Sequence, residues 1–245
     1  MTAINTYFDN LKELIDRTFE TQKDGMEKAA RYIADCFRDG GMLYTFGTGH
    51  GHLLALEIFY RAGGMARVCP ILDEKLMLHI SAAGSTLEER DETWVPKLLE
   101  KYPIKKGDVL LAFSNSGRNA VPVLLAKEAR ERGAVVIALT SMQHSGVVTS
   151  RNRLNLRLFE TADLVLDNGG ILGDACVKAA DGAMVGPTST AVGAAILQAI
   201  VARVKELSLE EKFEADFFKS SNVDGGDEWT DRLIARYEDI IPGLN

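Results

Sequence analysis

The sequence predicts an α/β protein in which a parallel β-sheet is covered by helices on both faces. Two observations carry this prediction. Short apolar runs recur along the chain at 42–46, 67–72, 108–113, 134–139 and 163–166. Amphipathic stretches lie between them, most clearly at 120–132 and 188–206. Continuous apolar strands that alternate with helices are typical of a parallel sheet buried on both sides.

The segments before and after this alternation are expected to be helical. Apolar residues at helical spacing predict two leading helices, over 8–19 and over 26–37. After position 206 come a charged helical stretch, a turn over 220–227 and a last helix over 229–241. We therefore expect N-terminal helices over 1–40 packed on the core or at a subunit interface, a central domain over 41–207, and a helical tail over 208–245.

Composition excludes several classes of function. The 245 residues carry 28 Lys and Arg against 35 Asp and Glu, a formal charge of −7, which argues against a nucleic-acid binder. Three scattered cysteines are typical of reduced thiols in a cytoplasmic protein. The uncharged stretch 182–202 contains about 15 helical residues, fewer than the roughly 20 that a membrane span needs. We expect no nucleic-acid and no membrane partner.

Glycine and hydroxyl residues follow the predicted strands. Gly47-Thr48-Gly49-His50-Gly51-His52 follows the first, Ser114-Asn115-Ser116-Gly117 the third, and Thr140-Ser141 the fourth, and Pro187-Thr188-Ser189-Thr190 opens a late helix. Ligands of open α/β sheets bind beyond the carboxyl ends of the strands. Glycine amides, helix N-termini and hydroxyls suit an anion such as phosphate. The alternative is that Ser114, Ser116 and Thr188 only cap their helices.

Two nucleotide-binding motifs are absent from these loops. A dinucleotide fingerprint that begins at Gly47 needs a third glycine at position 52, which is His52. No G-x-x-x-x-G-K-[ST] sequence occurs, so a P-loop nucleotide hydrolase is excluded.

Three motifs occur in a fixed order along the chain: the glycine loop, the Ser-Asn-Ser-Gly sequence and the Pro-Thr-Ser-Thr helix start. With these motifs the chain resembles the SIS (sugar isomerase) domain over about 37–204. The tail sequence Asn-x-Asp-Gly-Gly-Asp-Glu is similar to the UPF0309 group of stand-alone SIS proteins, and phosphoheptose and arabinose-5-phosphate isomerases share the general arrangement. The resemblance implies a three-layer αβα sandwich with a five-stranded, flavodoxin-like sheet. It also implies a phosphorylated sugar as ligand, and a homodimer or homotetramer with sites near the subunit interface. We expect no cofactor, and no metal ion because His50 and His52 have no third ligand at metal spacing.

In this resemblance the phosphate is held by Ser114, Ser116, Ser189 and Thr190, with backbone amides near Gly49 and Asn119. The complete set expected to bind the phosphosugar is Gly47, Thr48, Gly49, His52, Ser114, Asn115, Ser116, Arg118, Asn119, Thr188, Ser189 and Thr190. Arg118 departs from the family pattern, in which Glu, Ser or Thr often follows the glycine. Its guanidinium could hold a phosphate or a sugar carboxylate, or it could be a solvated side chain at a helix start.

Several residues could move a proton in such a site, and spacing does not select one. His50 lies in the ligand loop with His52. Glu88 is chosen from the cluster Glu88, Glu89, Asp91 and Glu92 because it is closest to the turn at 84–85. Asp174 takes the place of a Glu that arabinose-5-phosphate isomerases carry, with Asp181 competing for that alignment, and His79 is similar to a histidine of those isomerases. Asn222, Asp224 and Asp227 of the tail are weaker candidates.

The sequence therefore predicts a sugar-phosphate isomerase that converts an aldose and a ketose by proton transfer to and from a carboxylate or a histidine. Two alternatives stay open. One is a lyase that cleaves an ether from a sugar phosphate by elimination. The other is a sensor that binds a phosphosugar without catalysis, although the segment before the sheet lacks a basic recognition helix.

Overall fold

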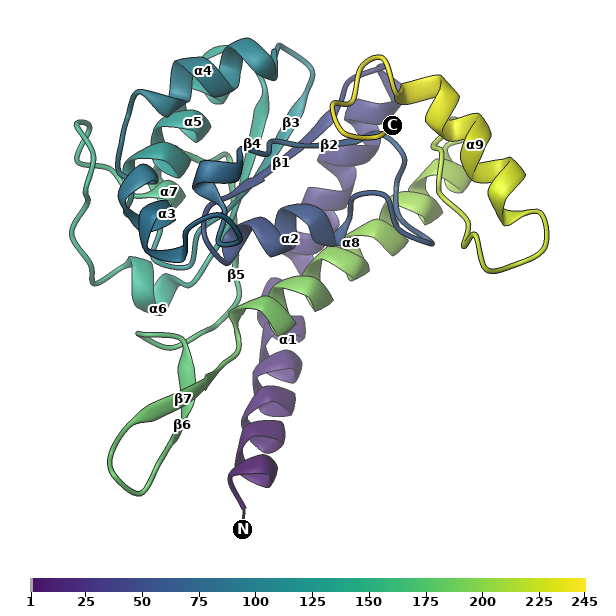
Figure 1. The fold of residues 1–245 in the computed structure, drawn as a ribbon. Helices are drawn as coiled ribbons and strands as arrows, with labels where there is room; N and C mark the ends of the chain where they lie inside the picture. The colour runs from purple at the N-terminus through teal and green to yellow at the C-terminus, as the bar shows by residue number, and fades with distance from the viewer. Residues whose placement is uncertain (1) are drawn as a thin grey trace.

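A computed structural model describes residues 2–245 (Figure 1). The chain forms seven strands and nine α-helices within these residues, with one short 3₁₀ turn. In chain order they are α1 (Ala3–Arg38), β1 (Leu43–Gly47), α2 (Gly51–Glu57), β2 (Val68–Pro70), η1 (Glu74–Leu76), α3 (Ala82–Glu88), α4 (Trp94–Lys101), β3 (Val109–Phe113), α5 (Ala120–Glu131), β4 (Val135–Thr140), α6 (Met142–Ser145), α7 (Leu158–Thr161), β5 (Leu164–Asp167), β6 (Ala175–Lys178), β7 (Met184–Pro187), α8 (Ser189–Glu210) and α9 (Gly226–Tyr237).

The first five strands form one parallel sheet in the order β2-β1-β3-β4-β5. This is the flavodoxin-like order, and the predicted fold class is confirmed. The register places Gly47, Phe113 and Leu139 side by side at the carboxyl ends of β1, β3 and β4. The loops that follow these three strands therefore begin at the same edge of the sheet.

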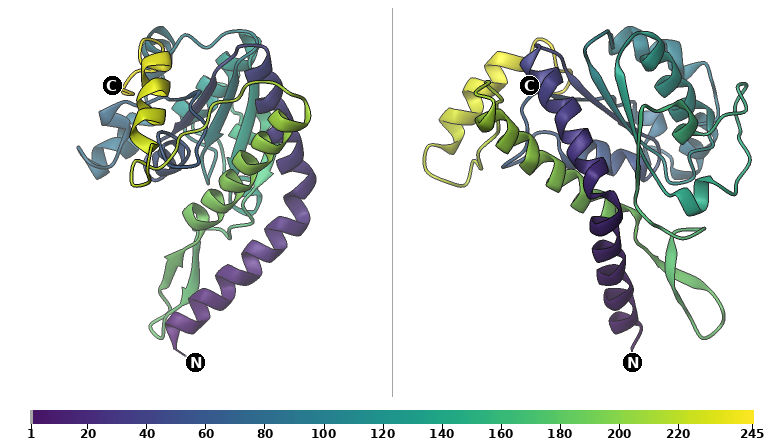
Figure 2. Two further views of the ribbon diagram at one scale, coloured as in Figure 1. Left: turned by 90° about the vertical axis from the view of Figure 1, so that its right-hand side faces the viewer. Right: turned by 180° about the vertical axis from the view of Figure 1, so that it is seen from behind.

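Helices cover both faces of the sheet, which makes three layers (Figure 2). One core lies between the sheet and α4, α5 and the C-terminal tail, with Leu98, Leu124 and Leu233 among its buried side chains. The second core lies between the sheet and α1, α2 and α8 and includes Ile33 and Ile200. Strands buried on both faces explain why their sequences are continuously apolar.

The leading segment is one helix and not the two that the sequence predicted. Helix α1 runs without a break from Ala3 to Arg38. Gly25 lies in its middle, where a Cβ atom would approach Cδ2 of Leu166 to 3.0 Å. Gln22 on the next turn accepts a hydrogen bond from the backbone of Asp167. Contact with β5 therefore compensates for the low helix propensity of glycine at this position.

A two-stranded hairpin, β6–β7, follows the sheet and was not predicted from the sequence. The first half of α1 and this hairpin project together from the body of the molecule (Figure 1). Two side chains of α1 tie them: Asn10 donates to the carbonyl of Cys176, and Tyr7 donates to the carbonyl of Pro187. The hairpin thereby leads the chain back to the sheet edge, where α8 begins.

Within residues 2–245, no helix combines the length and the apolar character that crossing a bilayer requires.

Candidate functional site

A cavity of about 420 Å³ opens at the carboxyl edge of the sheet. Its walls come from the loops after β1, β3, β4 and β5 and from the start of α8. The residues that line it are Thr48, Gly49, His50, Gly51, Leu54, Glu89, Phe113, Ser114, Asn115, Ser116, Asn119, Leu139, His144, Asn168, Gly173, Asp174, Pro187, Ser189 and Thr190.

The glycine loop after β1 forms because the backbone passes through spaces that leave no room for a side chain. A Cβ atom on Gly47 would lie 2.4 Å from the carbonyl carbon of Gly51. A Cβ atom on Gly51 would lie 2.9 Å from the carbonyl oxygen of Phe113. These glycines let α2 begin directly against the ends of β1 and β3, which brings Thr48 and His50 to the cavity.

The loop after β3 presents free donors to the cavity. Ser114 accepts a hydrogen bond of 3.1 Å from the amide of Gly117, so its hydroxyl hydrogen stays available. Among residues 2–245, the backbone amides of Asn115 and Ser116 donate to no backbone carbonyl. Gly117 has φ +58°, and a Cβ there would lie 2.6 Å from the Ser145 hydroxyl. The tight turn thus leaves a group of amides and hydroxyls suited to an anion.

Asn115 is held from two sides by its neighbours. Its carbonyl accepts hydrogen bonds from the hydroxyl of Thr140 and the amide of Ser141. Its side-chain oxygen accepts a 2.9 Å bond from Asn168, whose own side-chain oxygen accepts from the amide of Gly170. This network joins the loops after β3, β4 and β5 and makes the wall of the cavity rigid.

The carboxylate of Asp174 occupies the N-terminus of α8. One oxygen accepts from the backbone amides of Thr188 and Ser189 at 3.2 Å and 2.9 Å, and also from the Thr188 hydroxyl. The other oxygen accepts from the Ser189 hydroxyl. Asp174 has φ +68°, which is uncommon outside glycine, so the donors of α8 hold it in place. Asp174 and Ser189 both line the cavity.

Glu89 is the acidic residue that faces the cavity from the segment after α3. Its two carboxylate oxygens accept hydrogen bonds of 2.6 Å, one from the hydroxyl of Thr48 and one from the side-chain amide of Asn119. Burial raises the pKa of Glu89, while the hydrogen bond from Thr48 and the charges of Arg90 and Arg151 oppose that effect. The carboxyl therefore takes up a proton more readily than an exposed glutamate does.

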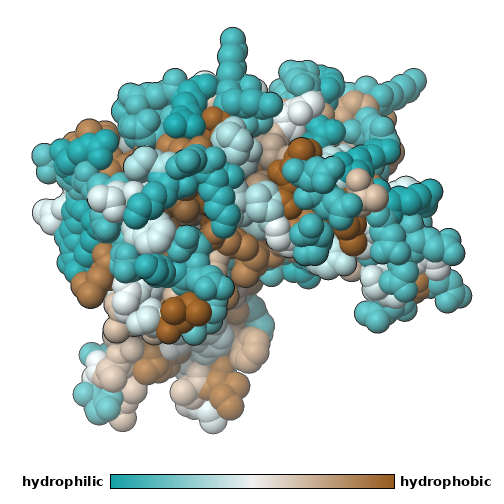
Figure 3. Space-filling model, turned by 45° about the horizontal axis from the view of Figure 1, so that its top comes forward, coloured by the Kyte–Doolittle hydropathy of each residue, from teal (hydrophilic) through white to brown (hydrophobic). Residues whose placement is uncertain are grey.

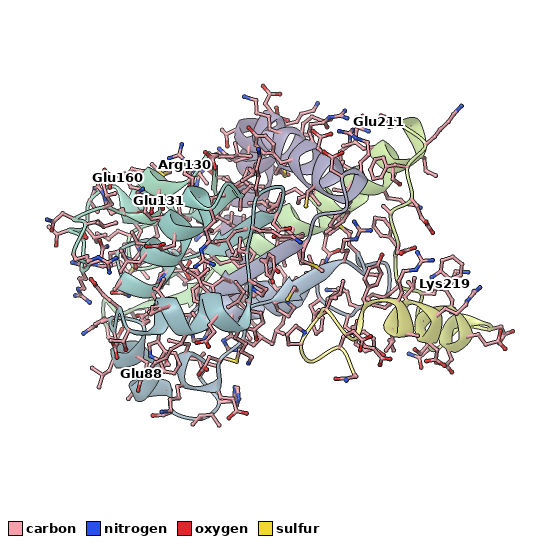
Figure 4. All side chains as sticks on the ribbon, turned by 90° about the horizontal axis from the view of Figure 1, so that it is seen from above. Glu88, Arg130, Glu131, Glu160, Glu211 and Lys219 are labelled. Atoms are coloured by element: carbon pink, nitrogen blue, oxygen red, sulfur yellow. The ribbon has the colours of Figure 1, made fainter. Side chains whose placement is uncertain are left out.

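Glu88, the residue chosen from the sequence, does not line the cavity. Its carboxylate accepts a 2.8 Å hydrogen bond from the indole of Trp94. Figure 4 shows its side chain at the outer edge of the molecule. Helix α3 ends at Glu88, and the turn that follows directs Glu89 to the interior. The neighbouring Asp91 and Glu92 are also engaged elsewhere, with the amide of Thr93 and with Arg153.

The four histidines have different surroundings. His50 lines the cavity, while His52 is buried and its Nδ1 pairs with the carbonyl of Gly49. His79 is exposed, and its ring lies 6.5 Å from that of His52, outside the cavity. His144 lines the cavity, and its buried Nδ1 has no partner within residues 2–245. Burial lowers the pKa of His144, opposed by the charge of Asp174, and this shift favours the neutral imidazole.

Most of the remaining predicted residues also line the cavity: Thr48, Gly49, Ser114, Asn115, Ser116, Asn119, Ser189 and Thr190. Gly47 and Thr188 are not among the lining residues. Arg118 turns away and donates to the backbone and hydroxyl of Thr149. Asp181 caps the hairpin turn by accepting from the amide of Ala183. The tail residues Asn222, Asp224 and Asp227 line a separate hollow on the tail.

Two polar side chains of the cavity, those of His144 and Asn168, were missed by the sequence analysis. His144 lies on α6, three residues beyond the Thr140-Ser141 pair that was noted after the fourth strand. Asn168 directly follows the fifth strand, and the residues after that strand were not considered. The position of each after a strand was the available signal.

Comparison with known proteins decides the family. Residues 6–141 match the sequence profile of the SIS domain. The chain belongs to the SIS domain family. Within this family it belongs to the UPF0309 group: a UPF0309 protein of Listeria innocua is 40% identical over 245 residues, which cover 99% of each chain. A UPF0309 protein of Geobacillus thermodenitrificans is 39% identical over 242 residues, 98% of this chain and 97% of the relative.

Solved structures share the SIS fold at low sequence identity. A phosphoheptose isomerase of Francisella tularensis superposes with a TM-score of 0.56 at 17% identity, covering 84% of this chain and 100% of that one. The NanR protein of Vibrio vulnificus, solved in complex with ManNAc-6P, gives a TM-score of 0.55 at 15% identity, over 96% of this chain and 70% of NanR. At these identities the likeness establishes the fold.

Proposed function

We propose that this SIS protein binds a phosphorylated sugar in the cavity and interconverts its aldose and ketose forms without a cofactor. One observation carries the proposal: a half-buried carboxyl of raised pKa, Glu89, lines the same cavity as the free donors of the loop from Ser114 to Ser116. The first can move a proton, and the second can hold a phosphate. The phosphoheptose isomerase and the ManNAc-6P complex among proteins of similar fold support a phosphosugar as ligand.

In this proposal the phosphate binds to the loop after β3. The hydroxyls of Ser114 and Ser116 and the amides of Asn115 and Ser116 donate to its oxygens. The N-terminus of α8 is a less suitable position, since the carboxylate of Asp174 already receives the donors of Thr188 and Ser189. Asp174 is therefore assigned the role of holding Ser189 and the start of α8 in place.

Glu89 acts as the base in the proposed reaction. The ionised carboxylate removes the proton from C2 of the open-chain aldose, and the electron pair moves to give an enediolate with its charge on the C1 oxygen. A proton passes from the C2 hydroxyl to that oxygen, and the protonated Glu89 returns its proton to C1, which completes the ketose. A raised pKa favours this exchange, because a carboxyl that titrates closer to neutral pH both accepts and returns the proton readily.

Two uncharged side chains of the cavity, His144 and Asn119, can form hydrogen bonds with the sugar. His144, whose pKa burial lowers, can hydrogen-bond the carbonyl or hydroxyl oxygen without adding charge. Asn119 donates through its amide to Glu89, while its buried Oδ1 has no partner among residues 2–245 and can accept from a sugar hydroxyl. A buried acceptor left without a donor costs free energy, so a ligand that supplies the donor gains affinity.

The proposal is tested by following proton exchange directly. The protein is incubated with a panel of aldose and ketose phosphates in D₂O, and NMR records deuterium uptake at C1 or C2 together with the products. We expect uptake and isomerisation for one sugar, and a loss of about 10²- to 10⁴-fold in the Glu89→Gln variant, the range for removing a general base. Glu88→Gln is the matched control, because it removes the same charge one residue away and outside the cavity.

The outcome also separates the two alternatives. Exchange at C2 accompanied by release of an ether substituent indicates a lyase. Binding of a phosphosugar with no exchange in the wild-type protein indicates a sensor. Turnover that survives in Glu89→Gln at the level of the Glu88→Gln control would show that Glu89 is not the base.

We also propose that the protein forms a homo-oligomer through α1. Ile4, Phe8, Ile15 and Phe19 fall on one stripe of this helix, and all four are exposed. Figure 3 shows hydrophobic surface on the two lower protrusions, where the hairpin and the start of α1 lie, in contrast to the mostly hydrophilic C-terminal tail. A second copy that packs along this stripe would cover it.

A further inference from the structure

We propose that three arginines beside the cavity, Arg90, Arg118 and Arg151, form an entry patch that draws an anionic ligand to the site and speeds its association. This inference rests on the proposed function, which supplies the anionic ligand, and it adds a step that precedes binding. The chain as a whole carries a formal charge of −7, so its average field repels a sugar phosphate. Fast association therefore requires a local group of positive charges where the ligand enters.

The backbone brings the three arginines together. The amide of Arg151 donates a 2.8 Å hydrogen bond to the carbonyl of Arg118. Arg90 directly follows Glu89, whose carboxylate accepts a 2.6 Å hydrogen bond from the side chain of Asn119. Asn119 in turn directly follows Arg118. The segment after α3, the turn before α5 and the loop before α7 therefore meet at one place, and each contributes one arginine.

No carboxylate pairs with these arginines. Within residues 2–245 none of the three forms an ion pair, although an arginine on the same loop, Arg153, does. The guanidinium of Arg118 donates to uncharged groups, the carbonyl and the hydroxyl of Thr149. Burial and the charges of Arg151 and Arg90 lower the pKa of Arg118, so the three side chains lie near enough to repel one another. This repulsion costs free energy, which an approaching anion reduces.

The entry patch lies beside the cavity and outside it. Glu89 and Asn119, which adjoin two of the arginines in the chain, line the cavity, whereas the arginines do not. The charges of Arg90 and Arg151 reach the interior, since both act to lower the pKa of Glu89. These two side chains are also exposed to solvent, so they meet a ligand before it enters the cavity.

Positive charges in such a place act mainly on the rate of association. Charged residues at the rim of a binding site change the association rate and its dependence on salt more than the rate of release. A field of this kind raises association rates by about 10- to 10³-fold at low ionic strength. Salt weakens the field, because the screening length falls from about 30 Å at 0.01 M to about 3 Å at 1 M. The entry patch therefore predicts fast and strongly salt-dependent association.

The experiment removes two charges at the patch and, in a control, two charges elsewhere. Phosphorus NMR line shapes give the association and dissociation rate constants of inorganic phosphate, glucose 6-phosphate and fructose 6-phosphate. The test variant carries Arg90→Gln and Arg151→Gln. The control variant carries Lys106→Gln and Arg132→Gln, at exposed positions shortly before β3 and β4, at the opposite edge of the sheet.

We expect the association rate constant to fall about tenfold in the test variant at low ionic strength, with little change in dissociation. The control variant should show a much smaller change, and the difference should vanish at about 1 M salt. The same comparison in a Glu89→Gln background excludes an effect that passes through the Glu89 carboxyl.

The results separate the two proposals. A test variant that behaves like the control would show that only net charge matters, and the entry patch is then wrong. Faster dissociation with unchanged association would show that the arginines contact the bound ligand, which overturns the entry patch while the phosphosugar site stands. If none of the three compounds binds, the anion site is itself wrong, and the entry patch falls with it.

Discussion

Replacing Glu89 by Gln should change the pH dependence of stability in a direction that the structure fixes. Because burial raises the folded-state pKa of Glu89, its neutral form is the better tolerated one. Its contribution to stability is full below the unfolded pKa of about 4.3 and is lost as the pH rises through the higher folded pKa. Near pH 8 the ionised carboxylate of Glu89 therefore lowers the free energy of unfolding of the wild-type protein, whereas a neutral glutamine at this position does not.

The size of the effect follows from the hydrogen bonds around the carboxyl. Glutamine keeps an oxygen for the hydroxyl of Thr48. Its amide nitrogen replaces the oxygen that accepts from Nδ2 of Asn119, so the Asn119 amide has to turn over: Oδ1 then accepts from the glutamine, and Nδ2 takes the position in which Oδ1 had no partner within residues 2–245. The number of unpartnered polar groups is unchanged, so the removed burial penalty dominates. Each pKa unit corresponds to about 1.4 kcal/mol. For a chain of this length, each kcal/mol moves Tm by about 2–4 °C.

The assay is thermal unfolding of Glu89→Gln and Glu88→Gln from pH 4 to pH 8. Comparing the two variants cancels the change in net charge, because each loses one carboxylate from adjacent positions. We expect the difference in Tm to move in favour of Glu89→Gln as the pH rises. A difference that stays constant, or that moves in favour of Glu88→Gln, would refute the account of a desolvated carboxyl at position 89.

Three further changes test other parts of the structure. Gly47→Ala should destabilise the protein by about 1–3 kcal/mol, seen as a lower urea midpoint, because the new Cβ would lie 2.4 Å from the backbone of Gly51; an unchanged midpoint would show that the loop is not closely packed. Asp174→Asn should cost about 1–2 kcal/mol by weakening the cap on α8, and an unchanged Tm contradicts that role. Phe8→Glu combined with Phe19→Glu should yield monomers in light scattering if α1 is the oligomer interface, whereas an unchanged mass would place the interface elsewhere.

The parts of the fold that sequence predicts are those set by local composition. Leu110 and Leu111, like Val136 and Ile137, form runs with no polar alternation, and such runs are strands buried on both faces. The loop at 114–117 could also be predicted, because the residues after a parallel strand lie at the ligand edge of the sheet. These features depend on a few consecutive residues and on no distant contact.

Features that depend on distant contacts could not be predicted. Whether α1 continues through Gly25 depends on its packing against Leu166. The hairpin strands are short and half-exposed, and Pro187 resembled a helix start. The choice between Glu88 and Glu89 depends on where α3 ends, since one residue turns a helical side chain by about 100°.

The measurement that tests the central claim most directly is calorimetric binding of sugar phosphates and their unphosphorylated parents to the wild-type protein and to Ser116→Ala. We predict that at least one sugar phosphate binds while its parent does not. Its affinity should fall at least about tenfold in the variant, because a hydrogen bond to a charged phosphate contributes about 1.5–3 kcal/mol. Equal binding of phosphate and parent, or full affinity in Ser116→Ala, would contradict the claim that the loop after β3 holds a phosphorylated sugar.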